Sequence, residues 1–343
     1  MSDCKQSAIS ASGFHPAKEP VSVKNKLTPA VLLGKVLPLG LFFLMLSNPK
    51  LSASCAAAGL SAWYTSVVPV LLPAMIFTGI LVRTDACTLL NPIAAPLFQK
   101  LFHLPAEAAS AWLTGLLCGY PAGAAVAGEL YHQERLTQEQ TRHLLLFCNY
   151  PSPMFLTGFL LTGCLKGQVP VWLFLPVIYL SGCITGFLTR ATAQNCQPPL
   201  TDRLSFEPSA PKKKGLIQVL EPSLFTAARI MLMVGLYIML FQMIAGFALH
   251  YLQLPPLVLC ILIGILEMTN GVLLAADLTL PLLPLSCLML FFAVFGGIST
   301  YLQSLSALGD AAFLGRKYLL GRILHASLAV GLYLFFFLLL QML

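Results

Sequence analysis

Long apolar runs separated by short polar stretches dominate the chain. The runs cover residues 29–47, 56–82, 91–104, 107–130, 144–164, 169–188, 224–249, 257–276, 280–308 and 324–340. Most of them approach the roughly 20 apolar residues that a helix needs to cross a bilayer, and only 91–104 is clearly too short. The pattern predicts an all-α polytopic membrane protein with about eight transmembrane segments.

Four of these runs are interrupted by glycine, proline or polar residues. The interruptions are Gly119–Gly123, Cys148–Pro153, Glu267–Gly271 and Gly296–Gln303. Inside a bilayer, non-helical backbone is tolerated only where it is buried in protein or lines a wet cavity. The pattern therefore predicts re-entrant or broken helices around a solute or ion site.

Polar stretches divide the chain into predicted parts. The parts are a disordered cytoplasmic tail (1–28), an N-terminal membrane half (29–190), a basic linker (191–221) and a C-terminal membrane half (222–343). The run Pro29–Ser47 resembles a signal peptide, but the many later runs favour an uncleaved anchor. The polar stretch Tyr131–His143 is interpreted as a solvated cytoplasmic loop.

The basic residues lead to a conflict over topology. Lysine and arginine collect in cytoplasmic loops, so the linker is predicted to be cytoplasmic. If the next three runs all crossed, the basic group Arg316, Lys317 and Arg322 would lie outside. A re-entrant segment at 257–276 or 280–308 resolves the conflict.

The two halves share a weak internal similarity. Gly115–Gly123 is similar to Gly264–Gly271, and Phe147–Pro153 is similar to Phe292–Ile298. Broken helices at corresponding positions of two halves point to a transporter site near the bilayer midplane. Glycine and leucine are common in this chain, so chance similarity remains an alternative to an internal repeat.

Composition narrows the class of protein. The 343 residues are 57% hydrophobic and 10% charged, whereas soluble domains carry about 25% charged residues. A soluble oxidoreductase and a nucleic-acid-binding protein are excluded. The net charge of +7 is therefore interpreted as a topology signal rather than as a nucleic-acid footprint.

Three polar side chains in the interruptions are candidates for chemistry. Glu267 lies near the middle of an apolar run, where an unpaired carboxylate costs about 2.5–3.5 kcal/mol. It is predicted to bind a coupling cation, carry a proton or contact a solute, or alternatively to cap broken backbone. Asn149 and Asn270 could recognise a planar polar solute or could satisfy freed backbone groups.

No motif for a metal, a cofactor or catalysis is found. The ten cysteines contain no CxxC, and the six histidines show no ligand spacing. A nucleophile elbow, a Walker loop and an HExxH motif are absent from the sequence. We predict no metal site, no cofactor and no enzymatic activity.

Four ordered motifs resemble a known family. GYPAGA at 119–124, LLLFCNYPSPMF at 144–155, LEMTNG at 266–271 and FGGISTYLQ at 295–303 are similar to YlbJ-type sporulation integral membrane proteins. That family belongs with the Gate-domain proteins of nucleoside recognition. The resemblance implies a membrane protein of the outer forespore membrane that is associated with moving dipicolinic acid, and it implies two Gate-like halves.

The motifs also supply the candidate solute-binding residues. They are Gly119, Tyr120, Pro121, Gly123, Asn149, Pro151, Ser152, Glu267, Thr269, Asn270, Gly271, Gly296, Gly297, Ser299 and Gln303. The expected function is a transporter or permease of a small anionic or aromatic polar solute, dipicolinic acid first. A non-transporting scaffold of a sporulation complex and a nucleoside or cation transporter are the alternatives. The expected partners are the solute and the lipid bilayer. Coupling to a proton or cation and assembly into a homo-oligomer are further possibilities that the sequence does not decide.

Overall fold

The computed structural model describes residues 29–84, 96–192, 216–308 and 314–342. The predicted tail 1–28 and most of the predicted linker 191–221 lie outside the described residues. The chain divides into two compact units, Met1–Ser47 and Asn48–Leu343. In the first unit, helix α1 covers Pro29–Ser47.

The described elements of the second unit are all helices. They are α2 (Pro49–Ala62), η1 (Trp63–Val67), α3 (Val68–Arg83), η3 (Phe98–Phe102), α5 (Ala108–Cys118), α6 (Ala122–His132), α7 (Gln138–Cys148), η4 (Phe155–Cys164), α8 (Val171–Thr189), η5 (Arg190–Thr192), α9 (Leu216–Leu252), α10 (Pro256–Leu266), α11 (Met268–Ala276), α12 (Leu282–Phe295), α13 (Gly297–Leu308) and α14 (Arg316–Met342). The prediction of an all-α protein is confirmed for these residues.

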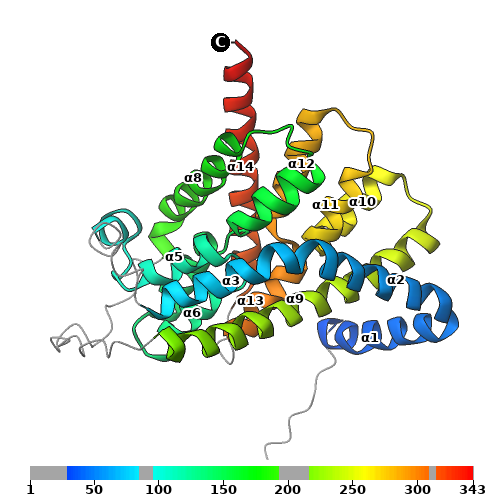
Figure 1. Ribbon diagram of the computed structural model, residues 1–343, viewed down its shortest axis with the longest axis horizontal. Helices are drawn as coiled ribbons and strands as arrows, with labels where there is room; N and C mark the ends of the chain where they lie inside the picture. Colours follow the sequence, from blue (N-terminus) through cyan, green and yellow to red (C-terminus); the bar gives the residue numbers. More distant parts are fainter. Residues whose placement is uncertain (1–28, 85–95, 193–215, 309–313, 343) are drawn as a thin grey trace, which may run out of the picture. The chain divides into compact units, whose positions relative to one another are not determined.

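Two aromatic-rich cores hold the second unit together. α14 packs against α8 and α12, and their shared core contains Phe174, Phe292 and Tyr333. Helices α5, α6 and α7 enclose a second core, in which the rings of Phe102 and Phe147 lie 4.5 Å apart. The long helix α9 packs along α2 and α3, as Figure 1 shows.

Two of the predicted spans are hairpins. In a continuous helix, Gly115 and Gly123 would lie about 12 Å apart along the axis. In the structure a Cβ added to Gly123 would lie 2.9 Å from the Cα of Gly115, so α6 folds back onto α5. Likewise a Cβ on Gly271 would lie 2.3 Å from the Cα of Gly264, so α11 folds back onto α10. Only glycine allows the two backbones of each hairpin to approach this closely.

The hairpin at α10–α11 bears on the topology conflict. A hairpin returns the chain to the side from which it entered. The start of α14, with Arg316 and Lys317, would then lie on the same side as the start of α9, which agrees with the tendency of lysine and arginine to collect on one side. The re-entrant segment that the sequence required is therefore best assigned to residues 257–276.

The interruption at Gly296 breaks a helix without reversing it. α12 ends where Gly296 takes the left-handed conformation, with φ of 83°, and α13 then begins at Gly297. Together they form a 27-residue apolar segment. Between α7 and η4, residues 149–152 are not helical.

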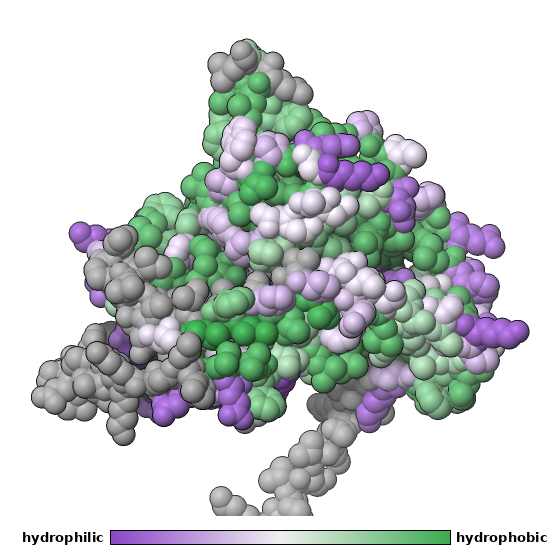
Figure 2. Space-filling view, in the orientation of Figure 1, coloured by the Kyte–Doolittle hydropathy of each residue, from purple (hydrophilic) through white to green (hydrophobic). Residues whose placement is uncertain are grey.

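The surface fits a bilayer. In the described residues, four helices are long and apolar enough to cross a membrane, or five if the consecutive helices over 35–67 count as one. Large apolar side chains such as Phe225, Phe335 and Leu338 are exposed. The face in Figure 2 is accordingly largely hydrophobic. The chain is a multi-pass integral membrane protein, while the count of about eight segments and the internal repeat stay predictions.

Three sequence interpretations were wrong in detail. The polar stretch 131–143 is mostly helical, because Thr137 and Gln140 form a capping box that starts α7, and His143 is buried. The linker is shorter than predicted, because α9 already begins at Leu216. Arg322 does not belong to a basic loop: it lies in α14 and is 1% exposed.

Candidate functional site

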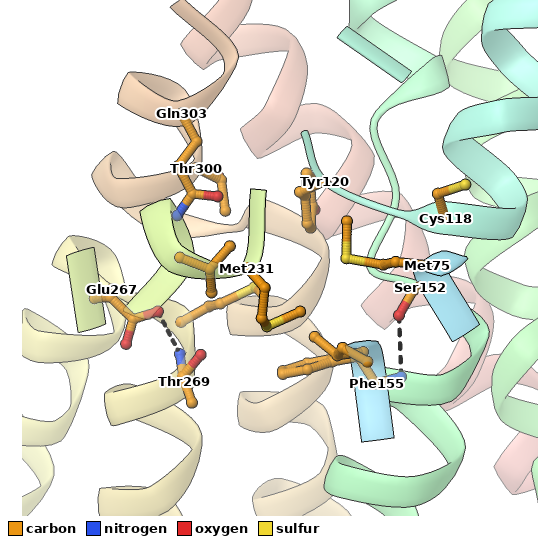
Figure 3. A pocket seen from close by; sticks show the side chains of 13 residues that line it. Met75, Cys118, Tyr120, Ser152, Phe155, Met231, Glu267, Thr269, Thr300 and Gln303 are labelled. Atoms are coloured by element: carbon orange, nitrogen blue, oxygen red, sulfur yellow. Dashed lines mark hydrogen bonds between the residues drawn. The ribbon is translucent and has the colours of Figure 1, made fainter. Parts of the chain in front are cut away.

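Residues from all four helix interruptions meet at one small cavity. Its volume is about 30 Å³, and its polar lining consists of Tyr120, Ser152, Glu267, Thr269, Thr300 and Gln303. Figure 3 shows these side chains converging from separate helices, with Met75, Met231 and Phe155 among them. A cavity of this size holds one or two water molecules. A larger solute could enter only if side chains or helices moved.

Glu267 caps the N-terminus of helix α11. Its carboxylate Oε1 accepts a hydrogen bond from the Thr269 backbone N–H at 2.9 Å, and Oε2 accepts one from Asn270 at 2.7 Å. The negative charge thus lies at the positive end of α11, which stabilises a carboxylate that is 2% exposed. The structure therefore supports the capping interpretation, and the same carboxylate also lines the cavity (Figure 3).

The two asparagines lie beside the cavity rather than on it. Asn149 donates from Nδ2 to the Ser304 hydroxyl at 3.1 Å and to the Tyr318 hydroxyl at 3.0 Å. Asn270 donates from Nδ2 to the Ile238 carbonyl at 3.5 Å. Both Oδ1 atoms are buried without a hydrogen-bond partner in the described part of the chain. Each amide ties an interruption to a neighbouring helix.

Arg322 connects two of the interruptions with the last turn of α12. One guanidinium nitrogen donates to the Asn149 carbonyl and lies 3.3 Å from His325 Nδ1, and the other donates to the Tyr120 hydroxyl and the Val294 carbonyl. Across residues 29–84, 96–192, 216–308 and 314–342, no carboxylate lies within ion-pair distance of it.

Helix ends compensate this buried charge. Asn149 follows the last residue of α7, and Val294 lies in the last turn of α12. Carbonyls at a helix C-terminus carry the negative end of the helix dipole, so they stabilise a nearby cation. Arg322 and Glu267 thus neutralise helix ends of opposite sign that the interruptions create.

The predicted site residues fall into two groups. Tyr120, Ser152, Glu267, Thr269 and Gln303 line the cavity. The remaining predicted residues are absent from its lining and shape the surrounding backbone; they are Gly119, Pro121, Gly123, Asn149, Pro151, Asn270, Gly271, Gly296, Gly297 and Ser299. Gly119, for example, would place a Cβ 2.5 Å from the Ser152 nitrogen, so it permits contact between the first two interruptions.

The list of candidate residues lacked Cys118 and also Thr300, although Thr300 lies within the predicted interruption Gly296–Gln303, and the central position of Arg322 was not predicted. A signal existed for Arg322, because it lies within the apolar run LLGRILHASLAV rather than in the polar segment before it. No group of His, Cys, Asp or Glu side chains in the described residues is arranged to hold a metal ion.

Comparisons with known proteins agree with the motifs. The Gate family, described as nucleoside recognition, matches residues 64–166, which contain the first two interruptions. The chain is 24% identical over 323 residues to the sporulation integral membrane protein YlbJ of Bacillus subtilis (strain 168), with 84% of this chain and 79% of that protein covered. No solved structure matches the chain. The resemblance to YlbJ-type proteins with a Gate domain is confirmed.

Proposed function

We propose that this chain is a secondary transporter or permease for a small anionic or aromatic polar solute. Dipicolinic acid crossing the outer forespore membrane during sporulation is the leading candidate, since the relative YlbJ is named as a sporulation integral membrane protein. The observation that carries the proposal is the meeting of four helix interruptions at one polar cavity inside an apolar protein. Such interruptions are costly in a bilayer, and they characterise transporter sites.

Electrostatics favour an anionic solute. The Tyr120 hydroxyl accepts a hydrogen bond from Arg322, and the Tyr120 side chain also lines the cavity. A carboxylate in the cavity would therefore lie one side chain away from a guanidinium that has no carboxylate partner among the described residues. Glu267 would not bind that carboxylate, because like charges repel. It would instead respond to a coupling proton or cation.

A flux assay tests the proposal. Terbium trapped in proteoliposomes would report the entry of dipicolinate, because dipicolinate chelates the ion and sensitises its luminescence. We expect Thr300→Val to reduce flux about tenfold, the effect of one lost hydrogen bond of about 1.4 kcal/mol. Thr162→Val, an exposed threonine of η4, is the matched control and should leave flux unchanged.

The same assay separates the alternatives. Inhibition by nucleosides but not by dipicolinate would favour nucleoside transport, the activity that the description of the Gate family suggests. Inhibition by divalent cations alone would favour cation transport. Absence of flux for any solute, together with a stable partner protein in pull-down experiments, would refute transport and favour a scaffold.

A further inference from the structure

Two larger cavities adjoin the central one. One, of about 420 Å³, shares Met75 and Cys118 with the central cavity. The other, of about 280 Å³, shares Gln303 with it. The two outer cavities meet each other at Thr226 of α9 and at neighbouring residues. Residues shared between their linings place the three cavities side by side, between α3, α6, α9 and α13.

The outer space carries charges that lipid would not tolerate. Arg229 of α9 lines the 280 Å³ cavity, and Glu129 of α6 lines the 420 Å³ cavity. Both residues are exposed, and Arg229 lies in a helix that is long and apolar enough to span a membrane. A charged side chain facing acyl chains costs about 2.5–3.5 kcal/mol or more, so charged residues in membrane helices face protein or water. The threonine and serine side chains of the lining are also compatible with water, among them Thr114, Thr226 and Ser306.

The two charges differ in how they are held. Glu129 accepts a hydrogen bond from Gln133 at 3.1 Å. Arg229 forms no ion pair and no hydrogen bond within the described residues. It lies on the cavity that reaches Gln303, so its charge is available to an anion moving toward the centre.

We infer that the two outer cavities form the water-filled entrance of the transporter, and that Arg229 selects anionic solutes there. This inference rests on the proposed function and adds the route and the residue that sets the charge preference. Met75 lines both the central cavity and the 420 Å³ cavity, and Met231 lines the central cavity beside it (Figure 3). Methionine side chains are flexible, so Met75 can separate the entrance from the centre and still yield to a solute.

Cysteine labelling tests the entrance without any transport. Thr226→Cys places a thiol where the two outer cavities meet, and Ala228→Cys places one on an exposed part of α9 that lines neither cavity. An anionic, membrane-impermeant methanethiosulfonate would be applied to proteoliposomes, and modification would be measured at the α9 peptide by mass spectrometry. The native cysteines therefore need not be removed. We expect the thiol at 226 to react at least about tenfold faster than the thiol at 228, because thiolate chemistry requires water.

The role of Arg229 is tested in the Thr226→Cys background. Arg229→Gln should slow the anionic reagent severalfold relative to a cationic reagent of equal size, and Arg229→Lys should keep the wild-type ratio. Equal rates at 226 and 228 would overturn the inference, and so would reaction at 226 only with a membrane-permeant maleimide, which would show a lipid-filled groove. An unchanged ratio in Arg229→Gln would overturn the selectivity. Labelling as expected without solute flux would refute transport alone, and flux without labelling would refute the entrance alone.

Discussion

Replacing Arg322 is the most informative perturbation of the candidate site. Its guanidinium links Tyr120 and Asn149, which belong to two different interruptions, to Val294 in the last turn of α12. In Arg322→Met the side chain keeps similar length and loses both the charge and the donors. Val294 still accepts a hydrogen bond from the Tyr120 hydroxyl at 2.9 Å, but within the described residues Arg322 is the only donor to the Asn149 carbonyl.

The expected effect is a balance of three terms. The hydrogen bonds of a charged donor contribute about 1.5–3 kcal/mol each, and an unsatisfied buried carbonyl costs about 1–3 kcal/mol. Arg322 is a buried cation with no carboxylate partner in the described residues. Its removal also abolishes the desolvation cost of the charge, and this gain offsets part of the lost stability. We therefore expect Arg322→Met to lower the free energy of unfolding by about 2–4 kcal/mol.

Arg322→Lys separates geometry from charge. The two terminal nitrogens of the Arg322 guanidinium reach different acceptors, and the single ammonium nitrogen of a lysine cannot reach them all. An ammonium is also more strongly hydrated than a guanidinium, so it costs more to bury. We expect the lysine variant to be at least as unstable as the methionine variant. Arg316→Met, an exposed arginine at the start of the same helix, is the matched control.

Thermal unfolding of the purified protein in detergent, followed by size-exclusion chromatography, measures all three variants. A midpoint for Arg322→Met equal to that of Arg316→Met would refute the linking role of Arg322. Full recovery by lysine would show that charge alone matters and that the forked geometry does not.

Two further substitutions test the hairpin and the cap. Gly115→Ala would place a Cβ 1.7 Å from the Cys148 carbonyl oxygen, so it should strongly lower yield and thermal stability. A Cβ at Gly331 meets nothing within 4 Å, so the control Gly331→Ala should be neutral or stabilising. Equal behaviour of the two variants in the same chromatographic assay would contradict the close approach of Gly115 to Cys148. Glu267→Gln keeps the shape of the side chain but loses the charge and one of the two acceptors at the start of α11. It should therefore lower the free energy of unfolding by about 0.5–2 kcal/mol. An unfolding midpoint no lower than that of the exposed control Glu221→Gln would rule out the capping role.

Hydrophobic patterning by itself determined the class of this protein. Long apolar runs avoid water only in lipid or in a large protein core. A content of 10% charged residues is too low to cover the surface of a soluble protein. Glycine, proline and asparagine marked all four helix interruptions, because these residues favour the backbone conformations that end helices. Those inferences depend on local chemistry, which a sequence carries directly.

Tertiary structure decided which interruptions reverse the chain and which residues meet. A helix break looks the same in sequence whether the next helix continues or folds back, and the outcome depends on whether glycines such as Gly264 and Gly271 come into contact. The apolar neighbours of Arg322 are visible in the sequence, but its contacts were beyond sequence reasoning. Its charge is tolerated because carbonyls 28 and 173 residues away in the chain converge on it, and no local pattern records that convergence.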